Sequence, residues 1–191
     1  MKEQFKGTLA LLSATVIWGF AFIAQSVGMD LIGPFTFQMV RCLLAVLVLV
    51  PGAFLLDIGK CSMGQSAQKW KNPDLWKSGI ICGCALFVAS SLQQIGLVYT
   101  DAGKAGFITA MYIVLVPILG LFLGRKVPKA AVFSVALAVV GLYLLSCLGV
   151  TEVNKGDLFL MGCALAFSVQ ITCIDRFAAA VDGFRLNCVQ A

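Results

Sequence analysis

Six long apolar stretches, separated by mostly short polar connections, are the feature that most constrains how this chain can fold. They run over residues 8–28, 35–56, 78–98, 105–123, 130–149 and 157–176. Each holds about 20 residues, the length that an α-helix needs to cross a hydrocarbon layer of ~30 Å. A soluble domain could not bury so much apolar surface. The sequence therefore predicts an all-α polytopic membrane protein with six transmembrane helices.

The charged residues indicate how these helices are oriented. They make up only 12% of the chain, and the net charge is +5. Lys and Arg concentrate before the first stretch and in the second and fourth connections: Lys2, Lys6, Lys60, Lys69, Lys71, Lys77, Arg125, Lys126 and Lys129. The other connections contain only Lys104 and Lys155. This asymmetry follows the positive-inside rule and predicts a cytoplasmic N-terminus. Because the positive charge is explained by orientation, we expect no nucleic-acid partner.

The cysteines do not form a metal-binding pattern. The chain has eight Cys and no His, and most of the cysteines lie inside apolar stretches. Cys82 and Cys84 are two residues apart and so point to different faces of a helix. We interpret the cysteines as small apolar residues of packed helices, and we expect neither a metal nor a cofactor.

Proline and glycine mark several helix boundaries. Gly33-Pro34 precedes the second stretch, and Asn72-Pro73 precedes the third. Pro117 lies inside the fourth stretch, where we expect a kink, because proline removes a backbone hydrogen bond of the helix.

The end of the chain resembles its beginning. At a constant offset of 149, residues 7–42 align with residues 156–191 without a gap, with identical residues at Gly7, Leu9, Leu11, Phe35 and Val40. Trp18 then aligns with Phe167, and Gln38 with Asn187. The register places the sixth stretch on the first, so the repeat unit has five spans. Because five is odd, the second copy would enter the membrane from the opposite side, as in the inverted repeats of secondary transporters.

This register predicts two domains. Residues 1–149 would form one five-helix repeat, and residues 150–191 would form the start of an inverted second repeat. The last residues would then be the beginning of a seventh span. We therefore expect the sequence to be a truncated form of a protein with about ten spans, unable to transport by itself.

Polar residues inside the apolar stretches are the candidate site. With the predicted topology they all fall in the outer half of the membrane, where Trp18, Phe22 and Gln25 also form a stripe at helical spacing. Together they predict an outward-opening, aromatic-lined pocket for a small-molecule substrate, with Trp18, Phe22, Gln25, Gln38, Arg41, Gln94, Thr109 and Tyr112 as its substrate-binding residues.

Two alternatives to a binding site stay open for these residues. Gln and Thr side chains also hold membrane helices together by hydrogen bonds. Arg41 could extend to the outer membrane surface, although an arginine there runs against the charge rule. Small-residue pairs such as Gly79 and Gly83 favour close helix packing, either within one chain or across a homodimer.

Several of these segments resemble the EamA branch of the drug/metabolite transporter superfamily. The resemblance is carried by residues 17–22, by residues 33–37 with Arg41, and most specifically by residues 94–117, which run from Gln94-Ile95-Gly96 to Val116-Pro117. It implies a ten-helix fold of two inverted repeats around a central cavity. It also implies a secondary transporter, commonly an exporter, of small metabolites or drugs across the bacterial cytoplasmic membrane.

Two other classes of function compete with this interpretation. A membrane enzyme would need an acid, a base, a nucleophile or a metal at one depth, and the sequence offers no such set. We therefore expect no enzyme. A non-transporting membrane fragment or assembly subunit remains the stronger alternative, because the second repeat is incomplete.

Overall fold

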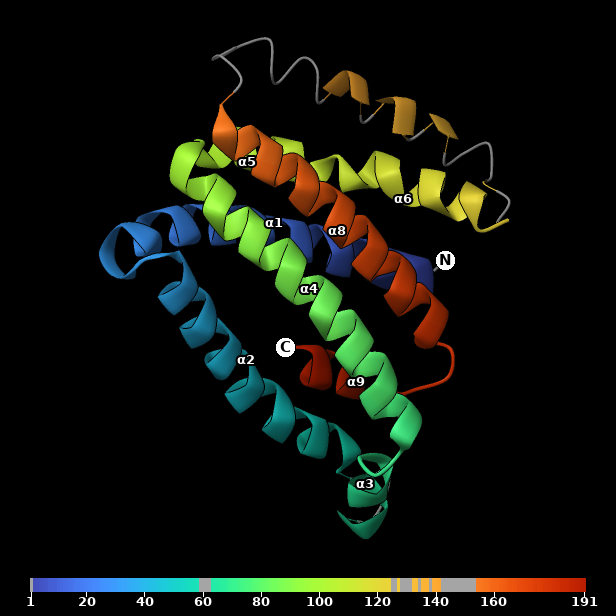
Figure 1. The fold of residues 1–191 in the computed structure, drawn as a ribbon. Helices are drawn as coiled ribbons and strands as arrows, with labels where there is room; N and C mark the ends of the chain where they lie inside the picture. The colour runs from blue at the N-terminus through green and yellow to red at the C-terminus, as the bar shows by residue number, and fades with distance from the viewer. Residues whose placement is uncertain are drawn as a thin grey trace.

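The computed structural model describes residues 2–58, 63–124, 127, 132–133, 135–137, 139–141 and 154–191. Among them the regular elements are all helices (Figure 1): α1 (Lys2–Ile32), α2 (Pro34–Asp57), α3 (Met63–Lys69), α4 (Pro73–Tyr99), α5 (Ala102–Ala110), α6 (Tyr112–Phe122), α8 (Lys155–Phe177) and α9 (Gly183–Gln190). The described part of the chain contains five stretches long and apolar enough to cross a membrane: Gly7–Met29, Pro34–Asp57, Pro73–Tyr99, Ala102–Phe122 and Lys155–Phe177. The predicted all-α polytopic fold is confirmed. The fifth predicted span, 130–149, lies largely outside the described residues.

The helix boundaries follow the proline and glycine signals. Gly33 has a φ of 73°, a conformation that glycine adopts easily, and α2 begins at the next residue. The Asn72 side chain accepts a hydrogen bond of 3.0 Å from the Asp74 backbone N–H and so caps α4. The fourth span is divided at Met111, whose N–H donates to the Ile108 carbonyl at 3.1 Å. Pro117 lies inside α6, so the division lies six residues before the position expected from proline.

The helix ends gather at two opposite ends of the bundle (Figure 1). At one end, called here the Tyr99 end, lie the α1–α2 and α4–α5 turns and the start of α8. At the other, called the Asp57 end, lie the end of α2, α3, the start of α4 and the end of α8. The first three described spans, α1, α2 and α4, therefore run in alternate directions, as a multi-pass membrane protein requires.

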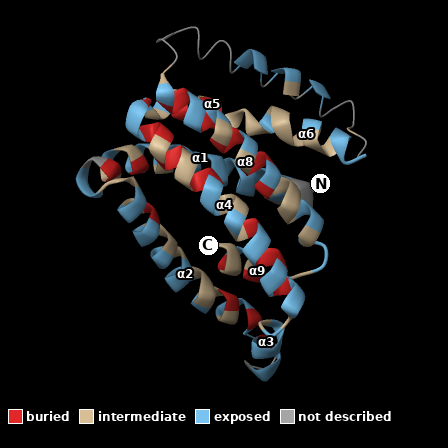
Figure 2. Ribbon diagram, viewed as in Figure 1, coloured by how far each residue is buried: buried red, intermediate tan, exposed pale blue. Residues whose placement is uncertain are grey.

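Helices α4 and α8 form the centre of the bundle. Buried residues concentrate on these two helices, whereas α2 is mostly exposed or half-buried (Figure 2). Glycines permit their close approach at the Tyr99 end. A Cβ atom at Gly96 would lie 2.5 Å from Leu160 Cγ, and one at Gly156 would lie 2.7 Å from the Gly96 carbonyl oxygen. Since real side chains do not approach so closely, the crossing depends on these two glycines.

Polar contacts also join α4, α5 and α8 at this end. The Lys104 ammonium lies 2.7 Å from an Asp157 carboxylate oxygen, and Thr100 donates to Asn154 at 3.0 Å. Asn154 and Asp157 also bond to each other's backbone N–H groups and form a capping box at the start of α8. The ion pair and the cap together position the first turn of α8.

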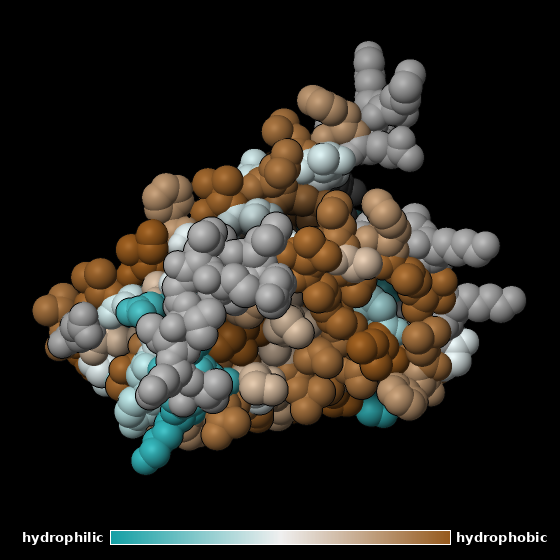
Figure 3. All heavy atoms as spheres, turned by 90° about the horizontal axis from the view of Figure 1, so that it is seen from above, coloured by the Kyte–Doolittle hydropathy of each residue, from teal (hydrophilic) through white to brown (hydrophobic). Residues whose placement is uncertain are grey.

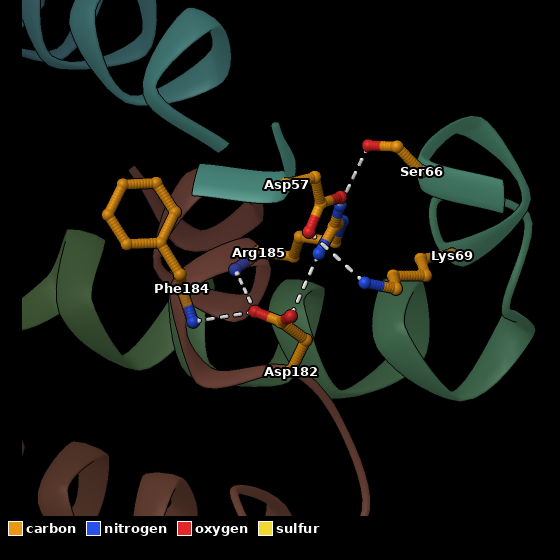
Figure 4. Close-up of polar contacts among 6 residues, drawn as sticks. All are labelled: Asp57, Ser66, Lys69, Asp182, Phe184 and Arg185. Carbon is orange, nitrogen blue, oxygen red and sulfur yellow. Dashed lines mark hydrogen bonds and ion pairs between the residues drawn. The ribbon is translucent and has the colours of Figure 1, made fainter. Parts of the chain in front are cut away.

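A second cluster holds α9 at the Asp57 end. Arg185 is buried and forms ion pairs with Asp57 at the end of α2 and with Asp182, the N-cap of α9 (Figure 4). It also donates to Ser66 Oγ at 3.1 Å, and its guanidinium carbon lies 5.6 Å from the centroid of the Trp70 ring. Helix α9 thereby enters the bundle between α2 and α4, where it packs on Gly79 and Gly83. This is close packing within one chain.

The outer surface of the helices is apolar. Seen from above, brown apolar side chains cover most of the described part of that face (Figure 3). Large side chains such as Phe20, Leu47 and Phe133 are among those that are exposed. In a soluble protein a surface of this kind would drive aggregation, whereas in a bilayer it faces lipid.

The first prediction concerns the α4–α8 crossing. Replacing Gly156 by alanine should destabilise the chain by about 1–3 kcal/mol, since the new Cβ overlaps α4. The matched control is Gly103→Ala, because a Cβ there meets nothing within 4 Å and the residue also lies in the first turn of a helix. Thermal unfolding of the detergent-purified chain should show a lower Tm for Gly156→Ala only. Equal Tm values would contradict the crossing.

The second prediction concerns Arg185 and uses Cys188, which is buried in α9. Replacing Arg185 by methionine leaves the Asp57 carboxylate without a buried partner and should release α9, because breaking a buried ion pair costs about 3–5 kcal/mol. With Cys188 as the sole cysteine, N-ethylmaleimide should label Arg185→Met much faster than the parent. The exposed Arg176→Met is the control. Unchanged labelling in Arg185→Met would contradict the role of the cluster.

Candidate functional site

The candidate site is a network of side-chain amides that joins three helices. Gln25 of α1 accepts two hydrogen bonds on Oε1, from Gln94 Nε2 of α4 at 3.1 Å and from the Arg41 guanidinium of α2 at 3.0 Å. Gln94 Nε2 also donates to Gln38 Oε1 at 3.3 Å. Four of the predicted site residues therefore lie in one network, although they come from three separate stretches of the chain.

Helix geometry explains how these side chains meet. Gln38 and Arg41 are three residues apart in α2, so they share a face, and Gln25 is in the part of α1 that precedes the α1–α2 turn. Gln94 is completely buried, Gln25 and Gln38 are buried, and Arg41 is half-buried. An interhelical hydrogen bond of this kind contributes about 0.6 kcal/mol in a membrane. The network therefore both holds the helices together and fixes the direction of the Arg41 side chain.

A cavity of ≈ 180 Å³ borders this network. Its wall comes from α1, α2, α4 and α8 and consists of Trp18, Ala21, Phe22, Gln25, Arg41, Leu86, Ser90, Gln93 and Phe167. The polar part of this wall is Gln25, Arg41, Ser90 and Gln93, and the aromatic part is Trp18, Phe22 and Phe167. The cavity can therefore hold a small molecule that is polar at one end and apolar at the other.

Three aromatic rings meet beside the cavity. The Trp18 ring centroid lies 6.2 Å from that of Phe167 and 6.4 Å from that of Tyr112, and the Tyr112 and Phe167 centroids are 6.3 Å apart. These separations are typical of favourable tilted and edge-to-face contacts. The cluster connects α1, α6 and α8, and two of its members, Trp18 and Phe167, line the cavity.

The structure distributes seven of the eight predicted residues over three hollows, whereas the buried Gln94 side chain lines none of the three. Thr109 and Tyr112 line a larger hollow of ≈ 480 Å³ between α1, α5 and α6, and Trp18 and Phe22 border both hollows. Gln38 and Arg41 also line a third hollow of ≈ 170 Å³ that extends toward Gln190 of α9. The polar network and the pair of Thr109 and Tyr112 are thus separate groups, with Trp18 and Phe22 between them.

Ser90 and Phe167 are among the residues of the cavity wall that were not predicted from the sequence. Ser90 is almost completely buried, and its Oγ atom has no hydrogen-bond partner among the described residues. It precedes Gln93 and Gln94 by about one helical turn, and this spacing was the available signal. Phe167 was noted only as the counterpart of Trp18, and nothing in its surrounding sequence marks it as part of a cavity. Within the described residues no group of three or more His, Cys, Asp or Glu could hold a metal ion.

A relative from an archaeon matches most of the chain. A protein named "Uncharacterized transporter" from Archaeoglobus fulgidus is 35% identical over 177 residues, which are 92% of this chain and 51% of that protein. The chain thus spans about half the length of this relative. No solved structure matches the chain.

A family model gives the family assignment. Residues 5–147 match the model described as the EamA-like transporter family, and this range contains the whole amide network. The same family was expected from the residues around Trp18, Arg41 and Gln94. The chain therefore belongs to the EamA-like transporter family.

Proposed function

We propose that this chain is part of a secondary transporter that moves small metabolites across the cytoplasmic membrane of a bacterium by alternating access, in the direction of export. The observation that carries the proposal is the cavity beside Gln25, Arg41 and Gln93, at the meeting point of four helices that come from both proposed repeats. Polar groups inside a membrane are costly and commonly line substrate pathways. The family and the archaeal relative's name support transport rather than catalysis.

Two inverted repeats would supply the alternating mechanism. At the offset of 149, the first residue of α2, Pro34, corresponds to the first residue of α9, Gly183. Arg41 corresponds to Gln190, and both side chains bond across to the preceding long helix, Arg41 to Gln25 and Gln190 to Gln170 at 3.1 Å. In addition, α1 runs toward the α1–α2 turn, whereas α8 runs away from that end (Figure 1). These correspondences support a pseudo-twofold relation between α1–α2 and α8–α9.

The contact between Trp18 and Phe167 supports the same relation. They are equivalent positions at this offset, and their ring centroids are 6.2 Å apart. Equivalent residues can touch only near a twofold axis. An axis between them would lie in the membrane plane, which is the arrangement of transporters with inverted repeats, whose substrate sites lie near the midplane.

The third prediction tests transport. We expect saturable flux in proteoliposomes when residues 1–191 are joined to the part of the archaeal relative that follows the matched region. We expect none from residues 1–191 alone, because alternating access needs two repeats around one site. A panel of labelled amino acids, sugars and carboxylates measures the flux. Saturable flux by residues 1–191 alone would contradict the two-repeat mechanism.

The variant Gln94→Leu tests the site in the same assay. Leucine is similar in size but cannot donate to Gln25 and Gln38, so it should lower the flux at least ~10-fold, which corresponds to about 1.4 kcal/mol. Gln68→Leu, at an exposed position of α3, is the matched control. Equal flux of the two variants would place the substrate elsewhere.

The fourth prediction tests the proposed orientation, with the Asp57 end in the cytoplasm. Ala67 of α3 and Gly103 of α5 are both exposed, one at each end of the bundle. In a cysteine-depleted background, an impermeant maleimide added to right-side-out vesicles should label Gly103→Cys and leave Ala67→Cys unlabelled until the vesicles are opened. The reverse pattern would invert the topology. We choose Ala67 and not its neighbour Ser66 as the α3 position, because Ser66 is buried against Arg185.

A further inference from the structure

The charge of Arg41 is not balanced by the residues around it. Arg41 lies inside α2, whereas the other described charged residues of the candidate spans lie near helix ends. At those ends Lys104 pairs with Asp157, and Asp57 with Arg185. Among the side chains that the structure describes, no Asp or Glu forms an ion pair with Arg41, and its hydrogen-bond partner is the neutral Gln25 amide. A cation at this depth is stable only when other groups satisfy its charge.

The cavity offers donors to an anion and no acid to a cation. Its wall includes the Arg41 guanidinium, the Gln93 amide and the Ser90 hydroxyl, and none of its described residues is Asp or Glu. Ser90 is 1% exposed, and its Oγ atom lacks a hydrogen-bond partner in the described part of the chain. A buried hydroxyl without a partner is unfavourable and indicates a ligand that completes its hydrogen bonding. The wall therefore suits a ligand group that accepts hydrogen bonds and carries a negative charge.

The remaining wall restricts the rest of the ligand. Trp18 and Phe167 contact each other and both line the cavity, so the part of the ligand beside them must be apolar. The volume of ≈ 180 Å³ is little more than that of a cavity of ~150 Å³ that accommodates benzene. One aromatic ring or a short aliphatic chain therefore fits beside Arg41, whereas a phosphorylated sugar is too large and too polar.

We propose that this cavity selects small apolar monocarboxylates, with Arg41 as the counter-ion of the carboxylate and with Trp18 and Phe167 beside the apolar part. A guanidinium binds a carboxylate with two parallel hydrogen bonds, a geometry that lysine cannot reproduce. An ammonium group on the ligand would find no acid among the wall residues that the structure describes, so a monocarboxylate is favoured over an amino acid. The inference rests on the proposed transport function, since it assigns the substrate class of the same cavity.

Binding of three probes of matched shape tests the charge preference without any variant. In this assay labelled benzoate is added to the detergent-purified 191-residue chain. Unlabelled benzoate, neutral benzamide and cationic benzylamine are then compared as competitors for its binding. We expect benzamide and benzylamine to bind at least ~10-fold more weakly than benzoate. Equal affinity of benzoate and benzamide, or no binding of any probe, would overturn the proposal.

Variants then assign the preference to Arg41. Arg41→Gln should lower benzoate affinity at least ~10-fold and abolish the preference over benzamide, and Arg41→Lys should retain part of it, because the charge remains. Ser90→Ala should weaken benzoate a few-fold. Arg176→Gln removes an exposed arginine at the end of α8 and should change nothing. Gel filtration and Tm show that each variant is folded, and unchanged benzoate binding by folded Arg41→Gln would overturn the proposal.

Flux measurements separate this proposal from the proposed function. Charge-selective benzoate binding without flux from the two-repeat chain would support the site and contradict transport. Flux of neutral or cationic compounds that benzoate does not inhibit would support transport and overturn the carboxylate preference. Inhibition of flux by benzoate, lost in Arg41→Gln, would support both.

Discussion

The close crossing of α4 and α8 is the constraint on which the rest of the structure depends. Lipid is as apolar as leucine, so membrane helices gain little from burying apolar side chains against each other and rely on close contact and polar bonds. Gly96 and Gly156 provide the close contact, and the hydrogen bond of 2.9 Å from the Asn154 side chain to the Tyr99 carbonyl provides the polar bond. Helices α5 and α6 then pack on α8, and α9 packs on α4. The shape of the cavity depends on this crossing, because Ser90 and Gln93 belong to α4 and Phe167 belongs to α8.

The two arginines within the bundle illustrate two solutions to one electrostatic problem. Arg185 is buried with two carboxylates, a hydroxyl and the Trp70 ring around it, so its charge is satisfied and it serves as a tie between α2, α3 and α9. Arg41 has an amide as its partner and a cavity beside it. A buried charge is tolerated only when neighbouring groups compensate it. The surroundings of Arg185 are therefore typical of a structural ion pair, and those of Arg41 are typical of a binding site.

The apolar spans could be predicted from the sequence because each helix satisfies its own backbone hydrogen bonds. Length and hydropathy are then sufficient, and the starts of α2 at Pro34 and α4 at Pro73 follow from local residues. The amide network was also within reach, since Gln25, Gln38, Arg41 and Gln94 are polar residues at a common depth. The division of the fourth span was less accessible, since it lies at Met111 and not at Pro117. Proline shows where a helix lacks a backbone hydrogen bond, whereas packing against other helices decides where the helix is divided.

The contacts between helices were decided by the tertiary structure alone. The depth of a residue in the membrane follows from its position along the helix. Which neighbouring helix its side chain contacts depends on how the helices cross. Thr109 and Tyr112 lie at a depth similar to Gln94, yet they line a different hollow, on the other side of Trp18 and Phe22. Asp57 and Arg185 are 128 residues apart and meet only because α9 enters beside the end of α2. The sequence by itself determined which segments cross the membrane and which polar residues lie within it, because both are properties of single helices. Which of those residues face one another was decided by how the helices pack, as at the glycine-permitted crossing of α4 and α8, since packing between helices is a property of no single helix.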